Sequence, residues 1–72
     1  MSEHGKTAEF LAFCIECYAR TKGISGAEVC GLFARSGVLG YLERGYDVLH
    51  TMGEAWLRAD INGFLESRGV AT

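Results

Sequence analysis

The sequence predicts an all-α fold, a small bundle of three to four short helices, and two observations carry that prediction. Apolar residues recur three and four positions apart in several stretches, which is the spacing of one face of an α-helix. The chain has no proline, and several of its ten glycines fall between those stretches, where they can end one helix and begin another. Because 72 residues suffice for only one domain, we expect residues 1–72 to form a single domain with an ordered core at about 7–68.

The longest apolar pattern predicts a first helix over residues 7–22. Thr7 can cap its first turn, and Gly23 can end it. One stripe at helical spacing would face the core: Leu11, Cys14, Ile15 and Tyr18. A second stripe lies beside it: Phe10, Phe13 and Cys17. Two adjacent stripes leave little polar surface, so we expect the second to contact a protein partner or a second copy of the chain.

Signals further along the chain predict two more helices. Ser25 and Glu28 have the spacing of a capping box, in which each side chain accepts a hydrogen bond from the other residue's backbone N–H. A second helix is therefore expected to begin at Ser25 and to end at residues 36–37. A third is expected over residues 38–52, with Val48 flanking its buried side and Gly45 allowing close contact with a neighbouring helix.

The last segment allows two structures. Five apolar residues fit one helix over residues 54–68: Trp56, Leu57, Ile61, Phe64 and Leu65. Alternatively, Asp60 caps a shorter helix over residues 61–68, and residues 54–59 form an irregular connector. We favour the second structure, because aspartate is better suited to an N-cap than to the interior of a helix.

Charge and hydropathy argue against two classes of partner. Lysine and arginine number 7 against 9 aspartates and glutamates, for a formal net charge of -2. The basic residues are scattered among acidic ones, so no concentrated positive surface for nucleic acid is expected. The longest apolar run, residues 10–15, is too short to span a membrane, and the first residues lack the pattern of a secretory signal. We therefore expect a cytoplasmic protein that binds neither nucleic acid nor a membrane.

The three cysteines form the sharpest apparent motif. Cys14-x-x-Cys17, with Cys30 and His50, would supply the ligands of a structural zinc site. Such pairs normally lie in a tight turn, and redox-active pairs lie at the start of a helix, whereas this pair falls in the middle of the first helix. We therefore predict buried free thiols, no metal ligands and no cofactor.

Asp47 and His50 lie three residues apart on the third predicted helix, so the carboxylate can orient the imidazole. Catalysis would also need a nucleophile from elsewhere in the fold, so we predict no catalytic residues and no enzymatic activity. A structural polar cluster, with His50 bonded to a neighbouring backbone group or tyrosine, is the favoured interpretation. Trp56 suits a core and a protein interface equally well. The residues expected at a contact with a partner or ligand are Phe10, Phe13, Cys17, Tyr46, Asp47, His50 and Trp56.

Several short strings resemble one family of small bacterial proteins. They are Tyr46-Asp47-Val48-Leu49-His50-Thr51 followed by Gly53, Phe13-Cys14-Ile15-Glu16 with Tyr18-Ala19, Ile24-Ser25-Gly26 with Glu28-Val29, and Asp60-Ile61. The family is a domain of unknown function, DUF3791, and the resemblance covers about residues 10–66, with YDVLHT as its most specific element. It implies a compact helical domain without an assigned activity. Genes of this family often neighbour a second family that resembles ADP-ribosyltransferases, which implies a pair of the toxin–antitoxin type.

These features predict a non-catalytic protein–protein interaction domain. The resemblance adds the expectation that it regulates or neutralises a neighbouring ADP-ribosyltransferase-like enzyme. The alternative is a helix-turn-helix-like DNA-binding accessory of a transcriptional regulator, because the second and third predicted helices are joined by a short turn. The candidate recognition helix offers Arg44 beside Glu43 and Asp47, which suits a groove lined with phosphates poorly.

Overall fold

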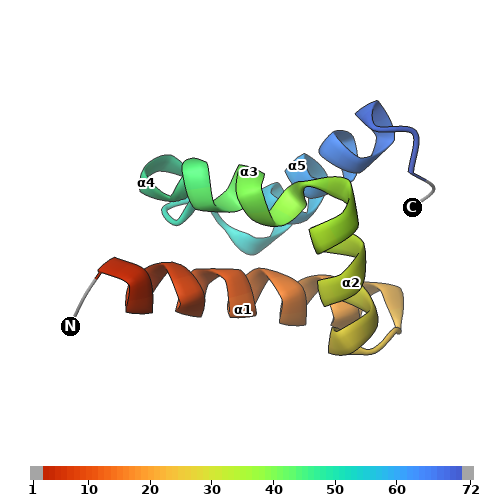
Figure 1. Ribbon diagram of the computed structural model, residues 1–72, viewed down its shortest axis with the longest axis horizontal. Helices are drawn as coiled ribbons and strands as arrows, with labels where there is room; N and C mark the ends of the chain where they lie inside the picture. The colour runs from red at the N-terminus through yellow and green to blue at the C-terminus, as the bar shows by residue number, and fades with distance from the viewer. Residues whose placement is uncertain (1–2, 71–72) are drawn as a thin grey trace.

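The computed structural model describes residues 3–70, and within that range the chain forms five helices and no strand (Figure 1). They are α1 (Glu3–Lys22), α2 (Gly26–Ser36), α3 (Val38–Arg44), α4 (Tyr46–Leu49) and α5 (Glu54–Ser67). The predicted all-α class is confirmed. Four helices have seven or more residues, and α4 is a single turn of four.

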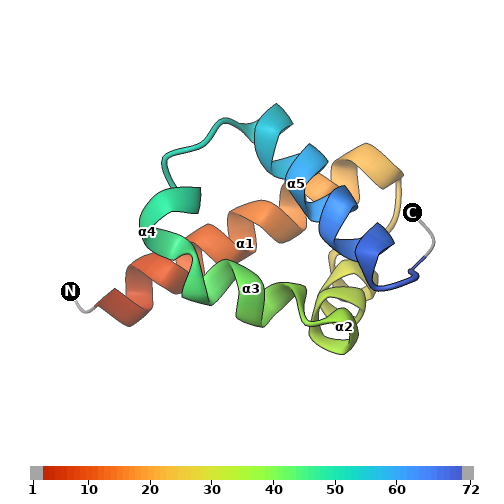
Figure 2. The same ribbon diagram turned by 90° about the horizontal axis from the view of Figure 1, so that it is seen from above.

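The helices form two layers that are joined at one end by α2. α1 lies along one side of the molecule, α2 turns away from its C-terminal end, and α3, α4 and α5 form the opposite layer (Figure 1). Seen from above, α4 lies over the N-terminal half of α1 and α5 over its C-terminal half (Figure 2). The most completely buried part of the core lies where α2, α3 and α5 meet. Its side chains with 0% exposure are Val29, Phe33, Val38, Leu42 and Leu65.

The start and the end of α2 are as predicted. The Ser25 hydroxyl accepts a hydrogen bond from the Glu28 backbone N–H at 3.1 Å, and the Ser25 N–H donates to the Glu28 carboxylate at 3.3 Å. This reciprocal pair satisfies donors that the first turn of a helix otherwise leaves open. Gly37 follows the last turn at φ 90°, a left-handed conformation that glycine adopts without steric cost.

The predicted start of the first helix is wrong. α1 begins at Glu3, and Thr7 lies inside it rather than at its N-cap. The helix ends at Lys22, as predicted, with Gly23 at φ 70°. The apolar periodicity on which the prediction depended begins at Phe10, so it could not detect an earlier turn of mostly polar residues.

The predicted third helix is divided at Gly45 into α3 and α4. A Cβ atom at this position would lie 2.7 Å from Leu49 Cδ1 and 3.3 Å from the Tyr41 carbonyl oxygen. Gly45 therefore makes room for Leu49, one turn further along the same segment, and not for a neighbouring helix as expected. Val48 on α4 is 66% exposed, so its predicted place beside the buried face is wrong.

The last segment is one helix, α5, so the predicted N-cap at Asp60 is also wrong. The helix begins after Gly53, whose backbone is extended, and Asp60 lies in its interior. The Asp60 carboxylate accepts a hydrogen bond from the Tyr41 hydroxyl of α3. This tertiary bond gives the side chain the partner that it would otherwise seek in the local backbone, which removes the usual objection to aspartate inside a helix.

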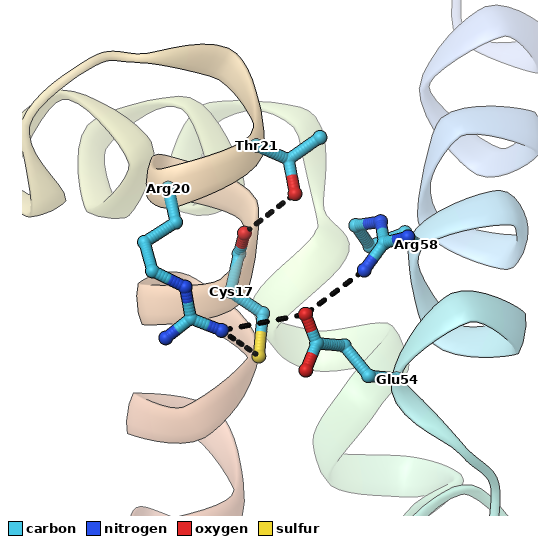
Figure 3. Close-up of polar contacts among 5 residues, drawn as sticks. All are labelled: Cys17, Arg20, Thr21, Glu54 and Arg58. Atoms are coloured by element: carbon cyan, nitrogen blue, oxygen red, sulfur yellow. Dashed lines mark hydrogen bonds and ion pairs between the residues drawn. The ribbon is translucent and has the colours of Figure 1, made fainter.

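The domain itself covers most of the second stripe of α1. Phe10 is 8% exposed and Cys17 is 4% exposed, so neither is available to a partner in this conformation, contrary to the prediction. Phe13 remains 44% exposed. α5 helps to cover this side of α1, because Tyr18 donates a hydrogen bond to Asn62 and Arg20 pairs with Glu54 at 3.3 Å. In Figure 3, Glu54 lies between Arg20 and Arg58, beside the Cys17 sulfur.

Candidate functional site

The single turn α4 divides its residues between the core and the solvent. Leu49 is 5% exposed and belongs to the core, and the Tyr46 ring packs edge-on against Phe10 of α1 with ring centroids 5.6 Å apart. Asp47 and Val48 are exposed between these two anchors. Val48, at 66%, is the most exposed of the large hydrophobic side chains in the described range. α4 is thus held by two side chains and displays the others.

His50 is held by Tyr46 and not by Asp47. The His50 Nδ1 atom lies 2.6 Å from the Tyr46 carbonyl oxygen, and the two rings are stacked with centroids 4.3 Å apart and an angle of 7° between their planes. A carbonyl oxygen only accepts hydrogen bonds, so Nδ1 is the donor in this contact. The pairing with Asp47 that the spacing allows is not formed. The interpretation of His50 as bonded to a neighbouring backbone group agrees with this geometry.

An open hollow of about 340 Å³ lies beside α4 and brings three helices together. α4 contributes Tyr46 and Asp47, and His50 follows at its end. The other lining residues come from α1 and from the end of α3: Lys6, Thr7, Glu43 and Arg44. Three of the seven residues expected at a contact, Tyr46, Asp47 and His50, therefore lie in one hollow.

A second hollow, of about 280 Å³, continues from the first along α1 and α3. Thr7 and Glu43 line both hollows, and Ala8 and Leu11 complete the second. The surface thus changes from mostly charged near α4 to partly apolar along α1. Sequence reasoning missed Lys6 and Thr7, because nothing in the local sequence indicates that the start of α1 lies against α4.

The other predicted contact residues are not part of this surface. Phe10 and Cys17 are buried, and Phe13 and Trp56 are 44% and 45% exposed on α1 and α5. Neither of these last two lines either hollow.

Two of the three cysteines, Cys14 and Cys17, have the environment of core residues. Burial raises the pKa of the Cys14 thiol to about 12, with a further contribution from Cys17. The pKa of Cys17 is also raised, first by burial and then by the nearby Glu54 carboxylate. Both thiols are therefore protonated at neutral pH, which suppresses their reactivity. Cys30 is exposed on α2, and within residues 3–70 no three side chains of the types that bind metals are grouped as a site.

The fold and the surface define a small helical domain with an open, mostly polar hollow beside a displayed helical turn. The chain belongs to the family described as "Protein of unknown function (DUF3791)", whose family model matches residues 9–68. The resemblance seen in the sequence is thereby confirmed. Comparisons with curated proteins and with solved structures gave no match. None of the helices in the described part of the chain is both long enough and apolar enough to cross a membrane.

Proposed function

We propose that this protein is a non-catalytic protein–protein interaction domain of the bacterial cytoplasm, and that α4 with its hollow is the contact surface. The observation that carries the proposal is the exposure of Val48. A large aliphatic side chain that is 66% exposed gains free energy when a partner covers it, and its neighbour Asp47 lines the first hollow, whose charged side chains can orient that partner. His50 supports the surface, because its stacking on Tyr46 fixes a polar side chain at the edge of the hollow.

The experiment compares two substitutions that each place a carboxylate on an exposed aliphatic position. Val48→Asp changes α4, the turn that borders the first hollow, whereas Ile24→Asp changes a residue between α1 and α2 that is 37% exposed and lies outside α4. Tagged forms of the wild type and of both variants are used for affinity capture from the native host, with circular dichroism to establish that each is folded. A protein captured by the wild type and Ile24→Asp but lost with Val48→Asp supports the proposal. Equal capture by all three forms contradicts it.

The family resemblance adds one particular partner to this proposal. We propose that the domain regulates or neutralises an ADP-ribosyltransferase-like enzyme encoded beside it; the support is the gene neighbourhood of the family and not a feature of the structure. Purified domain added to that enzyme should lower its rate of ADP-ribose transfer, and Val48→Asp should lower it less. An unchanged rate at saturating domain would exclude this partner and leave the interaction function open.

We do not propose the DNA-binding function that the α2–α3 pair suggested. α3 has seven residues, and the exposed ones are Glu43 and Arg44 at its end. One base and one acid provide no net positive charge for a phosphate backbone, so no observation favours this function over the interaction.

A further inference from the structure

The charged groups around the hollow are balanced in sign and are not paired with one another. Lys6 and Arg44 contribute two positive charges, and Glu43 and Asp47 contribute two negative ones. Both ion pairs within residues 3–70 involve Glu54 of α5, which pairs with Arg20 of α1 and with Arg58 of α5. None of the four charged side chains around the hollow therefore takes part in an ion pair within that range. A partner that approaches the hollow therefore meets four charges that are still free to form ion pairs.

The second hollow adds apolar area next to these charges. Ala8 and Leu11 line that hollow along α1, and Val48 is exposed on α4, although it lines neither hollow. An interface usually combines an apolar part that is removed from water with charged groups that set orientation, and this surface contains both.

We propose that the partner which fits this surface is a second copy of the same chain, bound about a two-fold axis. In such an interface the same patch meets itself, so each positive group of one copy faces a negative group of the other only if the patch carries both signs. A patch of one sign would repel its own copy. Here two cations and two anions border one hollow, so Lys6 of each copy can face Asp47 of the other across the axis.

This inference rests on the proposed interaction function and assigns the contact surface to a second copy of the chain. It moves the expected self-association from the second stripe of α1, which the domain largely buries, to α4 and the start of α1. A different protein that binds at the hollow would compete with the second copy.

The test uses two charge reversals that are each disruptive but compensate one another. In Lys6→Glu, the introduced carboxylate of each copy faces Asp47 of the other. In Asp47→Lys, the introduced ammonium group faces Lys6, so both homodimers bring like charges together. In a mixture of the two variants, the heterodimer brings only opposite charges together. We expect sedimentation equilibrium at low salt to show self-association of each variant weakened by about tenfold or more relative to wild type, and the equimolar mixture to associate within a few-fold of wild type.

Glu66→Lys is the matched control, because Glu66 is exposed on α5, makes no ion pair and lines neither hollow. It should leave self-association unchanged. A wild-type chain that remains monomeric at a concentration on the order of 1 mM overturns the second copy as partner, as does a mixture that associates no better than the single variants. These failures differ from failure of the proposed function, because loss of a captured protein in Val48→Asp would still support an interaction with another chain.

Discussion

The two ends of the molecule are built differently. Where α2, α3 and α5 meet, five side chains have 0% exposure, and α3 contacts both of the other two helices. At the other end, α4 contributes Leu49 to the core, and its Tyr46 ring packs against Phe10 of α1. Asp47, Val48 and His50 are exposed to solvent. The difference indicates that stability is concentrated at the first end and that the second end can present side chains to a partner with little loss of stability.

The largest expected effect separates the two ends directly. Phe33→Ala removes a fully buried ring and should lower the free energy of unfolding by about 3–5 kcal/mol, through lost burial and the cavity left behind. Val48→Ala removes only exposed methyl groups and should change it by less than about 0.5 kcal/mol. Urea denaturation followed by circular dichroism measures both values. Similar losses for the two variants would show that α4 belongs to the same cooperative core and would remove the contrast.

A second prediction compares glycines in two helical regions. Gly45→Ala should destabilise the domain by about 1–3 kcal/mol, because the new Cβ would lie 2.7 Å from Leu49 Cδ1 and 3.2 Å from its Cγ in a buried setting. Gly63→Ala in α5 meets nothing within 4 Å and should stabilise it by about 0.5–1 kcal/mol through helix propensity alone. Thermal and chemical denaturation give the two signs. A stabilising Gly45→Ala would mean that α3 and α4 can form one regular helix.

The smallest effect concerns the hydrogen bond between α3 and α5. Tyr41→Phe removes the donor to Asp60 and should cost about 1 kcal/mol at pH 7, since both residues are only partly buried. The bond to Asp60, with burial and the carboxylate charge, raises the pKa of Tyr41 from 10.0 to about 12. The folded chain thus holds this proton more tightly than the unfolded chain does. The stabilisation is complete below pH 10 and is lost between pH 10 and about 12.

Unfolding measured across this alkaline range provides the check. The wild type should lose its advantage over Tyr41→Phe as the pH rises, and the two stability curves should converge near pH 12. The raised pKa of Cys14 acts in both chains and cancels in the difference. A constant difference in stability up to pH 12 would show that Asp60 does not stabilise the protonated form of the Tyr41 hydroxyl.

Part of the candidate site could be predicted from the sequence, and part could not. Tyr46, Asp47 and His50 were recognised because they fall within the YDVLHT string and combine an aromatic ring with titratable groups. Lys6 and Thr7 were not, because they reach the hollow only when α1 lies against α4. Val48 is 66% exposed, whereas the prediction of one helix over residues 38–52 placed it beside the buried face.

By itself the sequence determined the features whose causes are local. The capping box of α2 needs only Ser25 and Glu28 within one turn, and the stop at Gly37 needs only a residue that tolerates positive φ. The helical class follows from apolar spacing within each segment. The tertiary structure alone decided that α5 is one continuous helix and that most of the second stripe of α1 is buried within the domain. Asp60 is satisfied by Tyr41, 19 residues away, and Phe10 is covered by Tyr46 from another helix, so the free energy that settles both lies in contacts between elements and not within them.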